Sequence, residues 1–326
     1  MTAGTFSIGV DLGGTNLKFC AADENGAIRA WHSVRTPTEA GCEGIVDTIV
    51  ANVPVVIERA NTELAAIESI GLGVPGTVDP DKGVIVFAPN IFAVNFPVVR
   101  AIRAHYDLPV HLSQDSQAAA WAEYMAGAGR GLTNIVSVTL GTGIGCGMVM
   151  DGKIYRGSLN HTAGELAHQI VEIDGNECNC GRRGCLEAHA GGLAIVRSAR
   201  QSITGLGELT GKSAQLISVK DVFELAQRGH MQALRIVGDV VKYVGIGLVN
   251  LANLLSPDLI SLSGGISEAP SELLFDPLVE FVRSHAYSTI ADSIRICRSP
   301  LGCDAPLIGV AILHKQTAAY AAAHLR

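Results

Sequence analysis

The stretch Phe6–Asn16, FSIGVDLGGTN, determines how the start of this chain folds. Apolar and polar or small residues alternate up to Asp11, which is typical of a β-strand with one buried face. Gly13 and Gly14 then form a turn, and a second strand-like stretch, LKFCAAD, follows it. Such a turn lets the backbone approach a phosphate, which can accept hydrogen bonds from backbone N–H groups and a nearby hydroxyl. A Gly-Gly pair shortly after an Asp also makes plain hairpin turns, so this stretch alone leaves both interpretations open.

In the phosphate-binding interpretation, the carboxylate of Asp11 holds Mg²⁺ directly or through water, because this cation prefers oxygen ligands. The residues expected to contact a nucleotide from this first turn are Asp11, Gly13, Gly14, Thr15, Asn16 and Lys18.

A second glycine-rich stretch, LGTGIGCG, begins at Leu140 and follows another predicted strand. Apolar strand residues continue after it, whereas a dinucleotide-binding fingerprint would open a helix there. A third glycine turn follows the predicted strand LISLS and is suited to packing against a flat adenine or ribose. Each turn alone could be an ordinary tight turn. The nucleotide contacts expected from these two stretches are Gly141, Thr142, Gly143, Gly264 and Gly265.

The order of predicted elements in the first hundred residues recurs from about residue 134. The first set is predicted to consist of three strands, a helix, a strand and another helix. Predicted strands and helices follow in a similar order in the second set. Such a duplicated α/β unit would place two phosphate-binding hairpins face to face across a cleft. We place the boundary between the two domains near Pro109.

Composition narrows the classes of function. The chain has 326 residues, 48% of them hydrophobic, and a formal net charge of -7. Because Lys and Arg form no cluster, nucleic acid is not an expected partner. The N-terminus lacks the basic and apolar segments of a secretory signal, and no uninterrupted apolar stretch reaches the ~18 residues of a membrane span. The expected location is therefore the cytoplasm, with no membrane association.

Three of the eight cysteines crowd into the eight-residue stretch CNCGRRGC, and a histidine precedes them by ten positions. In a chain without an export signal such a cluster indicates a metal rather than disulfides. One imidazole and three thiolates complete the tetrahedral ligand set of a closed structural zinc site. The alternative is three free thiols and a core histidine. The predicted zinc ligands are His168, Cys178, Cys180 and Cys185.

With this stretch the chain resembles the ROK family (repressor, open reading frame, kinase). The resemblance rests on GELAH at Gly164–His168 and on CNCGRRGCLE at Cys178–Glu187, and it extends from Ile8 to Leu313. It implies an α/β chain with the actin-like ATPase fold of hexokinases and heat-shock ATPases, in two duplicated domains around a cleft. The expected domains are residues 1–108 and 109–306, with a zinc loop at 161–190 and a C-terminal helix at about 307–326 that returns to the first domain.

The resemblance also implies the reaction. The family's catalytic base lies in a stretch that corresponds here to QDSQAAA, which makes Asp115 the expected base. A sugar hydroxyl that attacks the γ-phosphoryl group of ATP must lose its proton as the new bond forms. Asp115 also begins an Ala-rich helix, so it could serve as an N-cap, and the two roles are compatible. The residues expected to bind the sugar are Gly76, Asn90, Gln114, Asp115, Glu165, His168 and Glu187.

The implied activity is an ATP-dependent sugar kinase that phosphorylates a hexose such as glucose, with the 6-hydroxyl as the expected acceptor. N-acetylmannosamine or N-acetylglucosamine kinase is the alternative. Gln114, Gln117 and Ala167 depart from the family pattern, and Gln114 is an expected sugar contact, so the resemblance defines the reaction type better than the sugar. A non-catalytic sugar sensor is a further alternative. Repressors of this family carry a helix-turn-helix domain before the kinase-like core. A repressor is not expected here, because the first predicted strand starts near Phe6. ATP, Mg²⁺ and Zn²⁺ are the expected cofactors, and a homodimer is the expected assembly.

Zinc removal is expected to weaken sugar binding far more than nucleotide binding. Zinc is predicted to order the loop that carries Glu165 and Glu187. The glycine hairpins around Asp11 and Gly143 lie in separate segments of the sequence.

Overall fold

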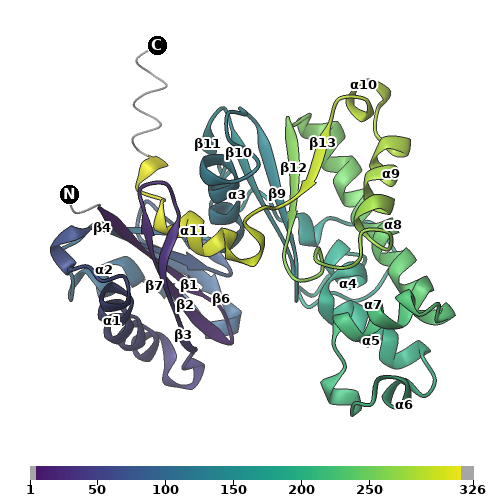
Figure 1. Ribbon diagram of the computed structural model, residues 1–326, viewed down its shortest axis with the longest axis horizontal. Helices are drawn as coiled ribbons and strands as arrows, with labels where there is room; N and C mark the ends of the chain where they lie inside the picture. The colour runs from purple at the N-terminus through teal and green to yellow at the C-terminus, as the bar shows by residue number, and fades with distance from the viewer. Residues whose placement is uncertain (1–4, 317–326) are drawn as a thin grey trace. The chain divides into compact units, whose positions relative to one another are not determined.

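The computed structural model describes residues 5–316 and divides the chain into two compact units. Unit 1 combines the described residues up to Ser137 with Gly147–Gly164 and with the segment that begins at Ser299. Unit 2 consists of Val138–Cys146 and Glu165–Arg298. Figure 1 shows the elements of both units.

The β-strands are β1 (Phe6–Leu12), β2 (Asn16–Asp23), β3 (Ile28–Arg35), β4 (Ile67–Val74), β5 (Thr77–Asp79), β6 (Val84–Ala88), β7 (Ala93–Phe96), β8 (Val110–Gln114), β9 (Ile135–Leu140), β10 (Ile144–Met150), β11 (Lys153–Ile154), β12 (Leu259–Ser263) and β13 (Arg295–Arg298). The α-helices are α1 (Gly41–Arg59), α2 (Val98–Arg103), α3 (Asp115–Ala126), α4 (Leu186–Ala190), α5 (Gly192–Ser202), α6 (Leu206–Thr210), α7 (Val219–Gln227), α8 (Met231–Leu255), α9 (Phe275–His285), α10 (Ser288–Ala291) and α11 (Ala305–Ala311). Short 3₁₀ helices include η3 (Pro89–Ile91) and η4 (Leu166–His168).

The sheet of unit 1 has the strand order β3-β2-β1-β4-β8. β2 is antiparallel to both β1 and β3, whereas β4 runs parallel to β1 and β8 runs parallel to β4. β1 and β8 therefore have the same direction and are separated by β4. Since the carboxyl ends of parallel strands meet at one edge of a sheet, Asp11 and Asp115 lie at the same edge. Two strand spacings of about 4.8 Å separate their strands by roughly 10 Å.

Helix α1 covers one face of this sheet and forms the main core of unit 1 (Figure 1). Ile45, Ile49 and Val53 recur at helical spacing on its buried face and pack with Leu17 and Phe19 of β2. The segment Thr38–Arg59 is long and apolar enough to cross a membrane by length and composition. In the structure, the apolar face of this helix packs against the sheet and belongs to the core of unit 1.

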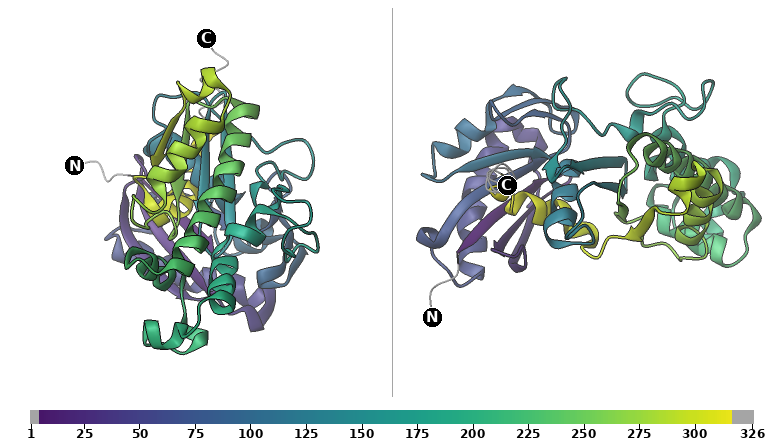
Figure 2. Two further views of the ribbon diagram at one scale, coloured as in Figure 1. Left: turned by 90° about the vertical axis from the view of Figure 1, so that its right-hand side faces the viewer. Right: turned by 90° about the horizontal axis from the view of Figure 1, so that it is seen from above.

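The opposite face of β1 and β2 carries small side chains, and helix α11 packs on it. A side chain at Gly9 would place its Cβ 2.6 Å from the carbonyl oxygen of Leu307, so only glycine permits this approach. Cys20 and Ala22 of β2 pack against Ala311 on the same face. Figure 2 shows α11, in yellow, against the purple strands that begin the chain.

A second five-stranded sheet has the order β11-β10-β9-β12-β13. β11 is antiparallel to β10 and β13 is parallel to β12, the directions seen for the corresponding strands of the first sheet. The recurrence predicted from the order of elements is thus present in the strand order. A small sheet, β5-β6-β7, follows β4 in unit 1.

The two compact units do not follow the predicted boundary at residue 108. β8 (Val110–Gln114) pairs with β4 in the first sheet, and α3 (Asp115–Ala126) also belongs to unit 1. The reason is that the register of β8 with β4 satisfies backbone groups that would otherwise lie at an open sheet edge. The described part of the C-terminal segment packs in unit 1, and residues 317–326 of the predicted C-terminal helix lie outside the described residues.

Candidate active site

The first glycine turn is closed by its own backbone. The N–H of Gly13 donates to the carbonyl oxygen of Asn16 at 3.0 Å, and the Thr36 hydroxyl donates to the Gly13 carbonyl at 2.6 Å. Gly14, Thr15 and Asn16 at its tip are exposed. The turn is therefore a fixed loop with an accessible tip, which is the form a phosphate-binding hairpin requires.

Asp11 lies at the end of β1 and is mostly buried, with 15% of its side chain exposed. Burial raises the pKa of its carboxyl above the ordinary value, and the Lys18 ammonium group, 3.9 Å away, opposes this shift. The ionised form of Asp11 therefore lowers the stability of the ligand-free protein. A buried carboxylate that lacks full compensation is typical of a group that functions with a bound cation.

Asp115 begins α3 immediately after β8 ends at Gln114. Its Oδ1 accepts a hydrogen bond of 2.7 Å from the N–H of Ser116. Gln114, not Asp115, occupies the N-cap position, and no side chain caps this helix. The N-cap alternative for Asp115 is therefore wrong. The carboxylate lies in the first turn of α3, at the positive end of the helix dipole.

Asn90 lies in η3 beside the first glycine turn. A Cβ added to Gly14 would lie 3.3 Å from Cβ of Asn90, so the predicted sugar residue and the predicted phosphate turn touch within unit 1. Gly76 follows β4 in the same unit. The predicted site residues of unit 1 are Asp11, Gly13, Gly14, Thr15, Asn16, Lys18, Gly76, Asn90, Gln114 and Asp115.

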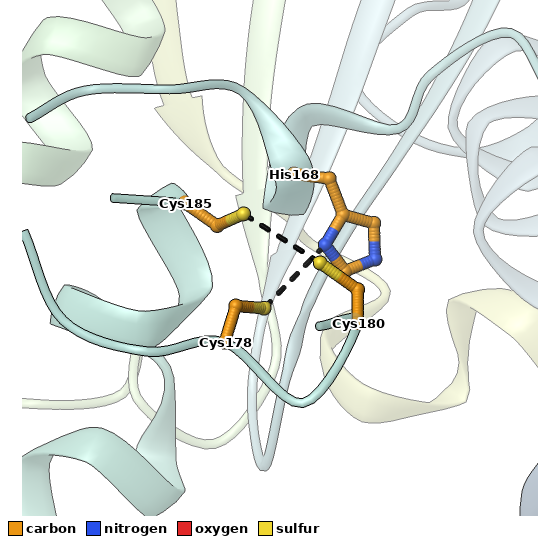
Figure 3. Close-up of side chains that lie close together, drawn as sticks. All are labelled: His168, Cys178, Cys180 and Cys185. Carbon is orange, nitrogen blue, oxygen red and sulfur yellow. Dashed lines mark hydrogen bonds between the residues drawn. The ribbon is translucent and has the colours of Figure 1, made fainter. Parts of the chain in front are cut away.

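The remaining predicted site residues belong to unit 2, and four of them form one cluster (Figure 3). The ligand atoms of His168, Cys178, Cys180 and Cys185 all lie within 4.8 Å of one another. Nδ1 of His168 is 3.7 Å from Sγ of Cys178, and Sγ of Cys180 is 3.7 Å from Sγ of Cys185. None of the three thiols is in a disulfide.

These distances suit a tetrahedral zinc ion. A Zn–S bond of about 2.3 Å gives a sulfur–sulfur distance of about 3.8 Å at tetrahedral angles, close to the observed separation. The loop reaches this arrangement through two glycines, since Gly181 and Gly184 have φ of +82° and +75°, values that other residues rarely adopt. Burial, together with the neighbouring thiols of Cys180 and Cys178, raises the pKa of Cys185 to about 12. A metal bound to this sulfur would stabilise its thiolate form and so offset the cost of burying it.

The two ring nitrogens of His168 face different groups. Nδ1 points into the thiol cluster, whereas Nε2 lies 3.9 Å from Oε2 of Glu165. Both side chains are substantially exposed, 39% for His168 and 43% for Glu165. One nitrogen is therefore available for a metal and the other faces a predicted sugar-binding carboxylate.

The second glycine hairpin shows a contact that sequence reasoning missed. Oε2 of Glu187 accepts a hydrogen bond of 2.9 Å from the N–H of Ile144. A Cβ added to Gly143 would lie 2.4 Å from that oxygen. The assumption that this hairpin is separate from the zinc loop is wrong, because Glu187 follows the predicted ligand Cys185 by two residues. No signal in the sequence pairs positions 144 and 187.

The two glycines of the third turn, Gly264 and Gly265, have different surroundings. A Cβ at Gly264 would lie 2.4 Å from the carbonyl oxygen of Leu140, and Gly264 has φ of +90°. A Cβ at Gly265 would meet no protein atom within 4 Å. The first glycine is thus required by the fold, whereas the second borders open space that a nucleoside could occupy.

Asp79, Asp81 and His161 form a second group of potential metal ligands, in unit 1. The Lys82 ammonium group already lies 2.7 Å from Oδ2 of Asp79, and the side chain of Asp81 is 86% exposed. We therefore assign no metal to this group. A cavity of ≈ 700 Å³ lies beside it and includes Arg100 in its lining, but no predicted site residue lines it.

The comparisons with known proteins show the family of the chain. The model of the ROK family matches residues 7–317. The chain belongs to the ROK family. The glucokinases of Halalkalibacterium halodurans and Streptomyces coelicolor are each 34% identical to it over 95% of this chain, and it covers 94% and 98% of their lengths. A ROK family glucokinase from Streptomyces griseus, solved in complex with glucose and AMPPNP, is 34% identical with a TM-score of 0.82 and covers 94% of this chain, which in turn covers 98% of that one. The predicted family and the predicted actin-like ATPase fold are confirmed.

Asp11→Asn tests the burial of this carboxylate. The variant should raise the midpoint of thermal unfolding of the ligand-free protein by about 2 °C or more, because it removes a desolvated charge. The loss of the attraction to Lys18 should be small, since 35% of that side chain is exposed to solvent. The folded-state pKa lies above the ordinary value, so ionisation destabilises the fold, and the gain should shrink as the pH falls toward 3.8. A variant less stable than the wild type at neutral pH would contradict this account.

Gly265→Ala tests whether a nucleoside packs against the third turn. The added methyl group meets no protein atom, so unfolding free energy should change by less than about 0.5 kcal/mol. The KM for ATP should rise at least several-fold while the KM for the sugar stays constant. Gly264→Ala serves as the control and should destabilise the fold. An unchanged KM for ATP in a folded Gly265→Ala protein would show that adenosine does not pack here.

Proposed function

We propose that this protein transfers the γ-phosphoryl group of ATP to the 6-hydroxyl of glucose or a closely related aldohexose. The similarity to glucokinases over nearly the whole chain supports the predicted class of enzyme, an ATP-dependent sugar kinase. The observation that carries the proposal in the structure is the placement of Asp115. It follows the carboxyl end of β8, on the same side of the sheet as Asp11 near the carboxyl end of β1, and its carboxylate lies in the first turn of α3.

In the proposed reaction, Asp115 accepts the proton of the sugar hydroxyl while the hydroxyl oxygen attacks the γ-phosphorus. The bond between that phosphorus and the bridging oxygen breaks, and ADP leaves. Backbone N–H groups of the first turn and of the hairpin at Gly141–Ile144 would hold the phosphates. Asp11 would hold Mg²⁺, which neutralises charge on the phosphate oxygens when bound.

Three further assignments belong to this proposal. The other hydroxyls of the sugar would form hydrogen bonds with Glu165, His168 and Glu187. A polar site of this kind rejects ligands that lack these hydroxyls, because its own polar groups would be left unpaired. The cysteine cluster would hold a structural Zn²⁺, because four protein ligands leave no position for water or phosphate. We expect the enzyme to act in the cytoplasm as a homodimer, without nucleic acid or membrane partners.

Asp115→Asn tests the catalytic base. The variant keeps the shape of the side chain but cannot accept the proton, so kcat should fall by roughly 10²–10⁴-fold. The KM for glucose and the thermal unfolding midpoint should change little. The measurement is ADP release in a coupled assay with Mg-ATP and glucose. Turnover within tenfold of the wild type would remove Asp115 from the proposed role.

The identity of the sugar can be tested at Gln114, which ends β8 beside the catalytic base. Asn offers the same amide on a shorter side chain. Gln114→Asn should therefore change the ranking of kcat/KM among glucose, mannose, N-acetylmannosamine and N-acetylglucosamine more than it lowers the best value. An unchanged ranking would show that this position does not contact the substrate. Preference of the wild type for an N-acylated sugar would favour the alternative activity.

A further inference from the structure

We propose that Glu187 is a positioning residue that fixes the glycine hairpin Gly141–Ile144 to the metal-ligand loop, so that metal binding and nucleotide binding are coupled. The inference rests on the proposed function, because it takes the hairpin as a phosphate-binding element. It concerns contacts within unit 2 alone.

The hairpin side of this link is a hydrogen bond from a backbone N–H to a carboxylate. Oε2 of Glu187 accepts from the N–H of Ile144 at 2.9 Å, and Ile144 is buried. The carboxylate lies directly against Gly143, where a Cβ would come within 2.4 Å of it. Within the hairpin, the N–H of Gly141 donates to the carbonyl of Gly143 at 2.9 Å. Glu187 therefore contacts the hairpin at its tip, where the chain reverses.

A second set of contacts comes from the residues after α4. The N–H of Gly192 donates to the carbonyl of Gly141 at 3.0 Å, and the N–H of Leu193 donates to the carbonyl of Thr142 at 3.3 Å. The N–H of Gly191 returns to the carbonyl of Glu187 at 2.9 Å. Helix α4 and the start of α5 thus hold the hairpin through three hydrogen bonds, one from a side chain and two from the backbone.

The metal side of the link is equally direct. Cys185, a predicted zinc ligand, is the N-cap of α4, and Glu187 lies in the first turn of that helix. The N–H of Leu186 donates to the carbonyl of Gln169, the residue after the ligand His168, at 2.9 Å. The side chain of Leu186 is buried against Gly247 of α8. Since α4 has only five residues, its position depends on these anchors and not on its own helix stability.

The consequence is a coupling that does not need the sugar. When the metal holds His168 and Cys185, the first turn of α4 is fixed and Glu187 is aligned with the N–H of Ile144. Without the metal, this turn keeps the contacts of Leu186 but loses one of its anchors, so Glu187 should be held less firmly against the N–H of Ile144. Hydrogen bonds to charged groups are stronger than neutral ones, so the link should have a measurable effect on nucleotide affinity.

The test compares Glu187→Ala with a matched control, Asp174→Ala, which removes an exposed carboxylate from the same loop. Binding of Mg-AMPPNP is measured by isothermal titration calorimetry without sugar. Glu187→Ala should weaken binding about tenfold, the size expected for one charged hydrogen bond. Asp174→Ala should leave nucleotide affinity within twofold of the wild type. Glu187→Gln keeps an oxygen that can accept from Ile144, so its loss should be smaller than that of Glu187→Ala.

A second measurement does not depend on ligand affinity. Hydrogen exchange of the peptide that contains Ile144, followed by mass spectrometry, should be faster in Glu187→Ala and in Cys180→Ser than in the wild type, and unchanged in Asp174→Ala. Cys180→Ser should contain less zinc and should also bind Mg-AMPPNP more weakly. Equal nucleotide affinity and equal exchange in the wild type and Glu187→Ala would overturn the inference. A wild type that binds no Mg-AMPPNP would instead contradict the proposed function.

Discussion

The close approach of helix α11 to the backbone of neighbouring elements is the constraint on which unit 1 depends. A Cβ at Gly71 in β4 would lie 1.8 Å from the carbonyl oxygen of Val310, and a Cβ at Gly309 would lie 1.8 Å from the carbonyl oxygen of Ala118 in α3. No side chain fits at either place. Glycines therefore let the C-terminal segment pack backbone to backbone against the first sheet on one side and against α3 on the other.

This packing determines where the chemical groups of unit 1 lie. Trp121 of α3 is fully buried and donates its Nε1–H to the carbonyl of Ile312 at 3.0 Å, which fixes the helix that begins with Asp115. β1 and β4, which contact the same C-terminal segment, end at Asp11 and its neighbours. Two carboxylates from distant parts of the sequence thus share one rigid support, which their proposed roles as proton acceptor and cation ligand in one reaction require.

The sequence allowed good predictions wherever residue type and spacing alone specify chemistry. The turn after Asp11 and the crowded ligands around Cys178–Cys185 are local patterns, and the structure describes a hairpin and a four-residue cluster there. Long-range contacts could not be predicted in this way. The pairing of β8 with β4 depends on which sheet offers an open edge, and the hydrogen bond from Ile144 to Glu187 joins residues 43 positions apart. Both depend on tertiary packing, which leaves no periodic signal in either segment.

The most direct measurement of the central claim is the identity of the product. Incubation of the purified protein with Mg-ATP and glucose, followed by ³¹P nuclear magnetic resonance, should show glucose 6-phosphate and ADP forming in equal amounts. The phosphorus atom of the new ester should couple to the two protons on C6 of the sugar. ADP without a sugar phosphate, or no reaction with any aldohexose or N-acylhexosamine, would contradict the assignment as a sugar kinase.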